Sequence, residues 1–186
     1  MDQRQLIIFV AVALMVIGAI LGFIARRRQR RRALRERFGP EYDRVLQKEG
    51  DVRRAEGVLE WRAKRREQFA IRPLAQSARG DFAARWKTVQ ALFVDDPRRA
   101  ITEADRLLNE IMYARGYPTV DFEQRAADLS VDHPGLVENY RLAHDIAQRH
   151  GQGRASTEDL RKALIHYRSL FDELLQPQSE KREALG

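Results

Sequence analysis

An unbroken run of apolar residues lies near the amino terminus of the chain. Leu6–Ala25 contains twenty residues without a charge or a strongly hydrogen-bonding side chain. As a helix with a rise of about 1.5 Å per residue, this run would be about 30 Å long, which matches the hydrocarbon core of a bilayer. Because backbone groups in lipid must bond to each other, the pattern predicts one transmembrane helix that begins at Leu6 and ends at Ala25.

The next segment, Arg26–Arg37, is dominated by arginine. It holds eight of the 34 basic residues and one of the 27 acidic residues, which leaves 26 of each elsewhere. A positive block beside an apolar run stays in the cytoplasm. We therefore expect a retained signal-anchor in a bacterial inner membrane, with the amino terminus outside and the carboxy-terminal domain cytoplasmic. A cleaved signal peptide fits less well, because the apolar run is long and the first five residues carry only Arg4 against Asp2.

Two contacts are predicted for this region. Gly18 and Gly22 are four residues apart, a spacing that lets two membrane helices approach and that would support a homodimer. Two tolerated glycines are the simpler alternative. The first six arginines set the topology and are candidate contacts for anionic lipid headgroups, worth about 1 kcal/mol each. They are Arg26, Arg27, Arg28, Arg30, Arg31 and Arg32. A nucleic-acid site is disfavoured, since no aromatic residues are interleaved with the arginines.

A densely charged segment, 38–73, follows the arginines. Phe38-Gly39-Pro40 should end one helix and start the next. Apolar residues recur at every seventh position thereafter, at Val45, Val52 and Leu59. Glu49 and Glu56 stand where the other seam residues of a coiled coil should be. We therefore expect a solvated helical stalk, or a helix docked on the distal domain, rather than self-association. Trp61 packs either on neighbouring basic side chains or on a partner.

The remaining residues up to 176 show helical periodicity and no sustained strand-type alternation. Four amphipathic segments begin after Ser77, Asp96, His133 and Ser156, and Phe122–Leu129 adds a turn or two. An aspartate followed by a proline marks the second and third starts. The face of the first segment is formed by Phe82, Trp86, Val89 and Phe93.

This pattern predicts an all-α fold with a single N-terminal transmembrane helix, a charged helical stalk and a small bundle of about four helices. The predicted divisions are an anchor (1–25), an arginine-rich collar (26–37), a stalk (38–73), a bundle domain (74–176) and a disordered tail (177–186).

Composition excludes several kinds of site. The chain has no cysteine, which rules out a disulfide framework, a thiolate metal site and a cysteine nucleophile. Acidic residues outnumber basic ones between 77 and 175, so the formal net charge of +7 does not indicate a nucleic-acid-binding face there.

No catalytic, cofactor-binding or metal-binding residues are predicted, and no cofactor is expected. The four histidines, at 133, 144, 150 and 166, lack the spacings of helical metal sites. Gly151-Gln152-Gly153 before Ser156 could suggest a phosphate cradle at a helix start. It lacks the lysine and the preceding strand of that motif, and a helix end, a linker and an N-cap account for it better. Adjacent acidic residues, such as Asp95 and Asp96, are explained by capping.

From about Trp86 onward, several phrases resemble a family of small bacterial proteins. They are Phe93-Val94-Asp95-Asp96-Pro97, Arg115-Gly116-Tyr117-Pro118, Asp121–Asp128, Val131-Asp132-His133-Pro134 and Ala155–Arg161. The resemblance covers about half of the chain. It implies one N-terminal transmembrane helix and a helical cytoplasmic domain. It brings no activity and no functional residues, because the family is itself uncharacterised.

The expected function is that of a single-pass inner-membrane protein that presents a cytoplasmic helical interaction domain to an unidentified protein partner. The alternative is a small membrane-bound enzyme with an unrecognised site in the bundle. A deep polar pocket lined by titratable groups with shifted pKa values would favour the enzyme.

Overall fold

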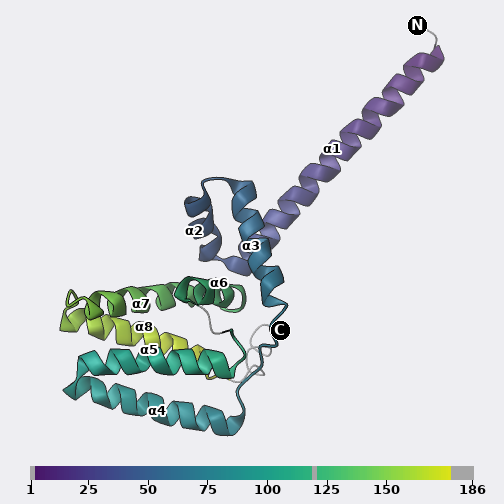
Figure 1. Ribbon diagram of the computed structural model, residues 1–186. Helices are drawn as coiled ribbons and strands as arrows, with labels where there is room; N and C mark the ends of the chain where they lie inside the picture. Colours follow the sequence, from purple (N-terminus) through teal and green to yellow (C-terminus); the bar gives the residue numbers. More distant parts are fainter. Residues whose placement is uncertain (1–2, 119–120, 177–186) are drawn as a thin grey trace. The chain divides into compact units, whose positions relative to one another are not determined.

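The computed structural model describes residues 3–118 and 121–176, and for residues 3–11 and 13 it describes the backbone alone. These residues form eight helices and no strands (Figure 1). The chain divides into two compact units, Met1–Leu59 and Glu60–Gly186. The helices are α1 (Gln3–Phe38), α2 (Pro40–Glu49), α3 (Val52–Arg66), α4 (Gln76–Asp95), α5 (Pro97–Ala114), α6 (Phe122–Asp132), α7 (Val137–Gly151) and α8 (Thr157–Leu174).

The first unit consists of α1, α2 and the amino-terminal half of α3. The predicted break at Gly39-Pro40 is confirmed: Gly39 has a φ of 49°, which favours glycine, and Pro40 occupies the first turn of α2. Gly50 ends α2 in the left-handed conformation. The buried apolar side chains of this unit are Leu34, Phe38, Tyr42, Val45, Ala55 and Leu59.

The heptad residues of the predicted stalk therefore belong to a folded unit. Val45 and Leu59 are buried and Val52 is partly buried. Glu56, which breaks the coiled-coil pattern, is itself 5% exposed. The segment predicted to be a solvated spacer therefore forms α2 and α3, which reverse the chain direction and help to enclose a buried core.

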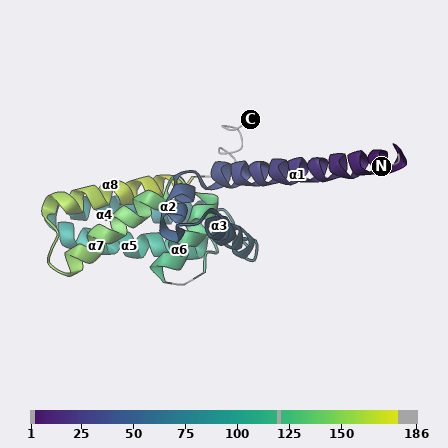
Figure 2. The ribbon, with the colours of Figure 1, turned by 90° about the horizontal axis from the view of Figure 1, so that it is seen from above.

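Helix α1 is a single straight helix in both views of the ribbon (Figures 1 and 2). Its described apolar side chains, at Val12 and from Leu14 to Ala25, are exposed. The arginine-rich segment follows them and begins at Arg26.

In the described part of the chain, no helix is both long and apolar enough to cross a membrane. The side chains of residues 6–11 and of Ala13 lie outside that part. This finding contradicts the predicted transmembrane helix from Leu6 to Ala25. Four further predictions depended on that helix and are wrong with it. They are the single-pass architecture, the signal-anchor, the inner-membrane localisation and the membrane-tethered function.

The second unit is a helical bundle in which α4 packs on α5, α5 on α8, and α8 on α7, with α6 against α7 (Figure 1). Five helices therefore stand where about four were expected. The additional helix is α6, which follows Asp121. The Asp121 carboxylate caps α6 by accepting from Gln124 N at 3.0 Å. This segment forms a helix of 11 residues rather than a turn or two. The predicted tail, 177–186, lies outside the described residues.

Local sequence signals set several helix ends in this bundle. The Asp96 carboxylate accepts from Arg99 N at 3.0 Å, and Pro97 begins α5, as predicted. Ser156 and Asp159 form a reciprocal capping box at the start of α8. The prediction that Asp132 caps a helix beginning at Pro134 is wrong, because α6 runs through Asp132 and α7 begins at Val137.

Candidate anion-binding groove

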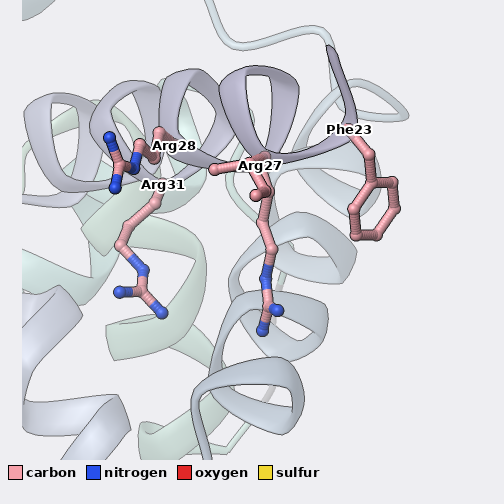
Figure 3. Close-up of a pocket in the computed structure, with 5 residues that line it drawn as sticks. Phe23, Arg27, Arg28 and Arg31 are labelled. Carbon is pink, nitrogen blue, oxygen red and sulfur yellow. The ribbon is translucent and has the colours of Figure 1, made fainter. Parts of the chain in front are cut away.

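Arginines in the carboxy-terminal half of α1 line two concave surfaces that share some of their residues. Residues four apart lie nearly above one another on a helix, so Phe23, Arg27 and Arg31 share a face. Figure 3 shows these three side chains extending from α1 on one side, with Arg28 beside them. Together with Ile24, they line a shallow hollow of about 290 Å³.

A larger groove, of about 700 Å³, lies between α1 and the first half of α3. We call it the arginine groove. Its lining residues are Phe23, Arg26, Arg27, Arg30, Arg53 and Glu56. Arg27 and Phe23 belong to both the groove and the smaller hollow. Four guanidinium groups thus face one carboxylate in a concave surface of the first unit.

The single carboxylate of the groove has its own partners. Glu56 Oε1 accepts from Arg31 Nε at 3.2 Å and from the Tyr42 hydroxyl at 3.3 Å. Burial, together with the negative charge of Glu56, raises the pKa of Tyr42, so this hydroxyl stays protonated and donates. Arg35 stacks on the Tyr42 ring, with its Cζ 5.0 Å from the centroid, and pairs with Asp43 at 3.2 Å. The charge of Glu56 is therefore offset from within the fold.

Several arginines around the groove are uncompensated. Within the described residues, Arg26, Arg27 and Arg28 are exposed and make no recorded ion pair. A guanidinium presents five N–H donors in a planar fork that matches phosphate and carboxylate oxygens. The arrangement can bind and neutralise a multiply charged anion. The one carboxylate in the groove lining, Glu56, is already bonded to Arg31 and Tyr42.

Most of the arginines singled out in the sequence lie at this site. Arg26, Arg27 and Arg30 line the groove, and Arg28 and Arg31 line the hollow. Arg32 lines neither. The sequence analysis assigned Phe23 to the apolar run, and it missed the groove residues Arg53 and Glu56 because only the fold brings α3 beside α1. The lipid-headgroup contact remains a prediction.

The predicted contact through Gly18 and Gly22 also remains a prediction. A Cβ added to either glycine would meet no atom within 4 Å, so packing within this chain does not require glycine there.

A second polar cluster lies at the carboxy-terminal end of α3, within the second unit. Arg65 Nε donates to Asp128 Oδ1 at 3.2 Å, and Arg66 Nε donates to Asp132 Oδ2 at 2.5 Å. The hydroxyl of Tyr117 also donates to that Asp132 oxygen, at 2.8 Å. Asp128 is fully buried, and burial raises its pKa. These pairs hold the end of α3 against α6.

One groove of the bundle bears on the enzyme alternative. A groove of about 300 Å³ lies between α4 and α5, and its lining consists of Arg85, Thr88, Val89, Leu92, Arg99, Glu103 and Leu107. Burial raises the pKa of Tyr140 to about 12 and lowers that of His144, yet neither side chain lines this groove. Among the residues that line the groove, Arg85 has a raised pKa, because its guanidinium donates to Glu110 Oε2 at 2.6 Å.

His133 and His166 each have a hydrogen-bonding partner elsewhere in the second unit. His133 Nδ1 lies 3.1 Å from Glu173 Oε1, and His166 Nδ1 lies 2.9 Å from Asn139 Oδ1. No cluster of three potential metal ligands occurs among the described residues. Gly153, with a φ of 69°, follows the end of α7 and precedes the Ser156 cap, which agrees with the linker interpretation.

No family model, no curated protein and no solved structure matches the chain, so the resemblance drawn from the phrases after Trp86 remains a prediction.

Proposed function

We propose that the protein binds anions carrying more than one phosphate group, in the arginine groove between α1 and α3. One observation carries the proposal: four arginines line this concave surface, and the only carboxylate among them is already bonded to Arg31 and Tyr42. Guanidinium–phosphate pairs are charge-assisted and often bidentate. A volume of about 700 Å³ accommodates several phosphate groups.

The shared ligand chemistry is the phosphate group, which free polyphosphate and phospholipid headgroups both supply. Nucleic acid fits less well. Binding to single strands uses aromatic platforms for successive bases, and Phe23 is the single aromatic residue in the groove lining. The second unit adds almost no basic excess, since Glu60–Gly186 holds 21 basic and 20 acidic residues.

The test is calorimetric titration of the full-length protein with tripolyphosphate and, separately, with the soluble headgroup compound glycerol phosphate. The groove variant changes Arg26, Arg27 and Arg53 to glutamine. Hydrogen bonds to charged groups contribute about 1.5–3 kcal/mol each, so the variant, which loses three guanidinium groups, should bind tripolyphosphate at least about 100-fold more weakly. Because all three side chains are exposed, its thermal stability should match that of the parent.

The matched control removes three positive charges from the second unit, by changing Arg106, Arg161 and Arg168 to glutamine. These side chains are also exposed. The control should bind within about twofold of the parent once salt screens long-range effects. Equal weakening in both variants would overturn the proposal, because it would mean that only net charge matters.

The two ligands test the requirement for more than one phosphate group. Tripolyphosphate should bind more tightly, and comparable affinity for glycerol phosphate, which carries a single phosphate group as a simple phospholipid headgroup does, would overturn that requirement. A single-stranded oligonucleotide that binds more tightly per phosphate than tripolyphosphate, with Phe23→Ala abolishing the difference, would replace the proposal with nucleic-acid binding.

A further inference from the structure

We propose that Glu56, together with Tyr42, is a positioning residue that fixes the guanidinium of Arg31 for a ligand phosphate in the hollow, which shares Phe23 and Arg27 with the arginine groove. This inference rests on the proposed function and adds to it a residue that determines binding geometry. It is counterintuitive on charge alone, because a carboxylate beside an anion site should weaken binding. The geometry around Glu56 gives it the opposite effect.

Glu56 is buried, and two neighbouring side chains donate to one of its carboxylate oxygens. It is 5% exposed, and its Oε1 accepts from both the Tyr42 hydroxyl and Arg31 Nε. Tyr42 is 1% exposed and carries Arg35 over its ring. The carboxylate is therefore buried, and one of its oxygens is bonded to a buried tyrosine.

Arg31 extends from this buried carboxylate toward solvent. Its side chain is 44% exposed, whereas that of Glu56 is 6% exposed. The bond to Glu56 occupies Nε and leaves the four N–H donors of the two terminal nitrogens available. Those donors lie in the hollow that Arg31 shares with Arg27 and Arg28, as Figure 3 shows.

Immobilising a long side chain before binding reduces the entropy lost when the ligand arrives. An exposed arginine has several rotatable bonds, and ordering such a side chain opposes association. A guanidinium already held by a carboxylate has lost much of that freedom during folding. Arg27, which makes no recorded ion pair, lies one turn away on the same face and provides the unpositioned comparison.

The experiment measures tripolyphosphate affinity for the full-length Glu56→Gln variant. If Glu56 positions Arg31, the affinity falls about threefold to tenfold although a negative charge has been removed. If Glu56 acts only through its charge, the affinity rises. Asp43→Asn is the matched control, because Asp43 bonds Arg35 but lines neither the groove nor the hollow. It should not weaken binding.

A double-mutant cycle separates positioning from general structure. With Arg31 changed to glutamine, the further change Glu56→Gln should cause no additional weakening. A purely structural role would weaken binding in both backgrounds, and that result would overturn the inference. Tyr42→Phe removes one hydrogen bond without removing charge and should give a smaller loss of affinity, which covers the case that Glu56→Gln does not fold.

The two proposals can fail independently. If the groove variant loses affinity while Glu56→Gln binds more tightly, the positioning role is wrong and the phosphate site stands. If the groove variant and the control with three substitutions in the second unit behave alike, the phosphate site itself is wrong.

Discussion

The indole of Trp86 on α4 stacks on the ring of Phe171 on α8, with centroids 4.1 Å apart and planes at 16°. Trp86 is 6% exposed, so it belongs to the core of the bundle and not to an exposed recognition surface. Phe82 and Phe93, on the same face of α4, are partly buried against the same core. The amphipathic face of α4 is therefore part of the bundle interior.

The first prediction concerns this ring pair. Trp86→Ala should destabilise the second unit by about 3–5 kcal/mol, because burial is lost and a cavity remains beside Phe171. Trp86→Phe should cost less, since an aromatic ring is retained. Thermal or denaturant unfolding measures both changes. An alanine variant that unfolds like the parent would show that the core of the bundle lies elsewhere.

Gly116 provides a second prediction, because its backbone is restricted in two ways. Its φ is 96°, and a Cβ at this position would lie 2.7 Å from the Ala70 carbonyl oxygen. Gly116→Ala should therefore cost at least about 1–2 kcal/mol from the backbone conformation alone. Gly135→Ala is the control, since a Cβ there would meet nothing within 4 Å. Equal unfolding midpoints for the two variants would contradict the prediction.

The buried pair of Arg65 and Asp128 gives a third prediction. Asp128→Ala should destabilise the second unit by about 1–3 kcal/mol, because it removes the acceptor of Arg65 and of Gln124. The exposed pair of Asp145 and Arg149 is the comparison, and Asp145→Ala should cost less than about 0.5 kcal/mol. If chemical denaturation gave similar losses for both, the pair at the end of α3 would not be stabilising.

His144 makes the stability of the second unit depend on pH. Its ring stacks on Phe122 with centroids 3.6 Å apart, and burial lowers its pKa below the usual 6.5, although Asp105 favours the charged form. The folded protein therefore binds this proton less readily than the unfolded chain. The stability from His144 is present above about pH 6.5 and is lost as the pH falls through the lowered folded pKa.

The measurement compares thermal unfolding of the parent and of His144→Phe between about pH 7.5 and about pH 5. The melting temperature of the parent should fall more, because the variant keeps a ring against Phe122 but has no proton to bind. Identical falls in the two proteins would show that other groups account for the pH dependence.

The parts of the fold that the sequence predicted are those set by neighbouring residues. Gly39-Pro40, Asp96-Pro97 and the Ser156–Asp159 box each fix a helix end through bonds or dihedral angles within a few positions. Asp132 misled the prediction because its carboxylate bonds to Arg66 and Tyr117 rather than capping a helix. No local pattern distinguishes these two uses of an aspartate.

The sequence predicted the part of the candidate site that lies on α1, but not the part that lies on α3. The arginines of α1 stand out as a block, and helical periodicity places Arg27 and Arg31 on one face. Glu56, 25 residues after Arg31, could be interpreted from sequence only as a break in a heptad pattern. Its bonds to Arg31 and Tyr42 depend on the turn-back of α2 and α3, which is a tertiary feature.

Side-chain NMR of the arginine Nε–H groups in the full-length protein tests the central claim most directly. Tripolyphosphate should shift the resonances of Arg26, Arg27 and Arg53 saturably, because these guanidinium groups line the groove and have no recorded ion pair within the protein. The resonances of Arg106, Arg161 and Arg168 should stay in place. Equal, non-saturating shifts in both sets, or shifts confined to the second set, would contradict a phosphate site in the arginine groove.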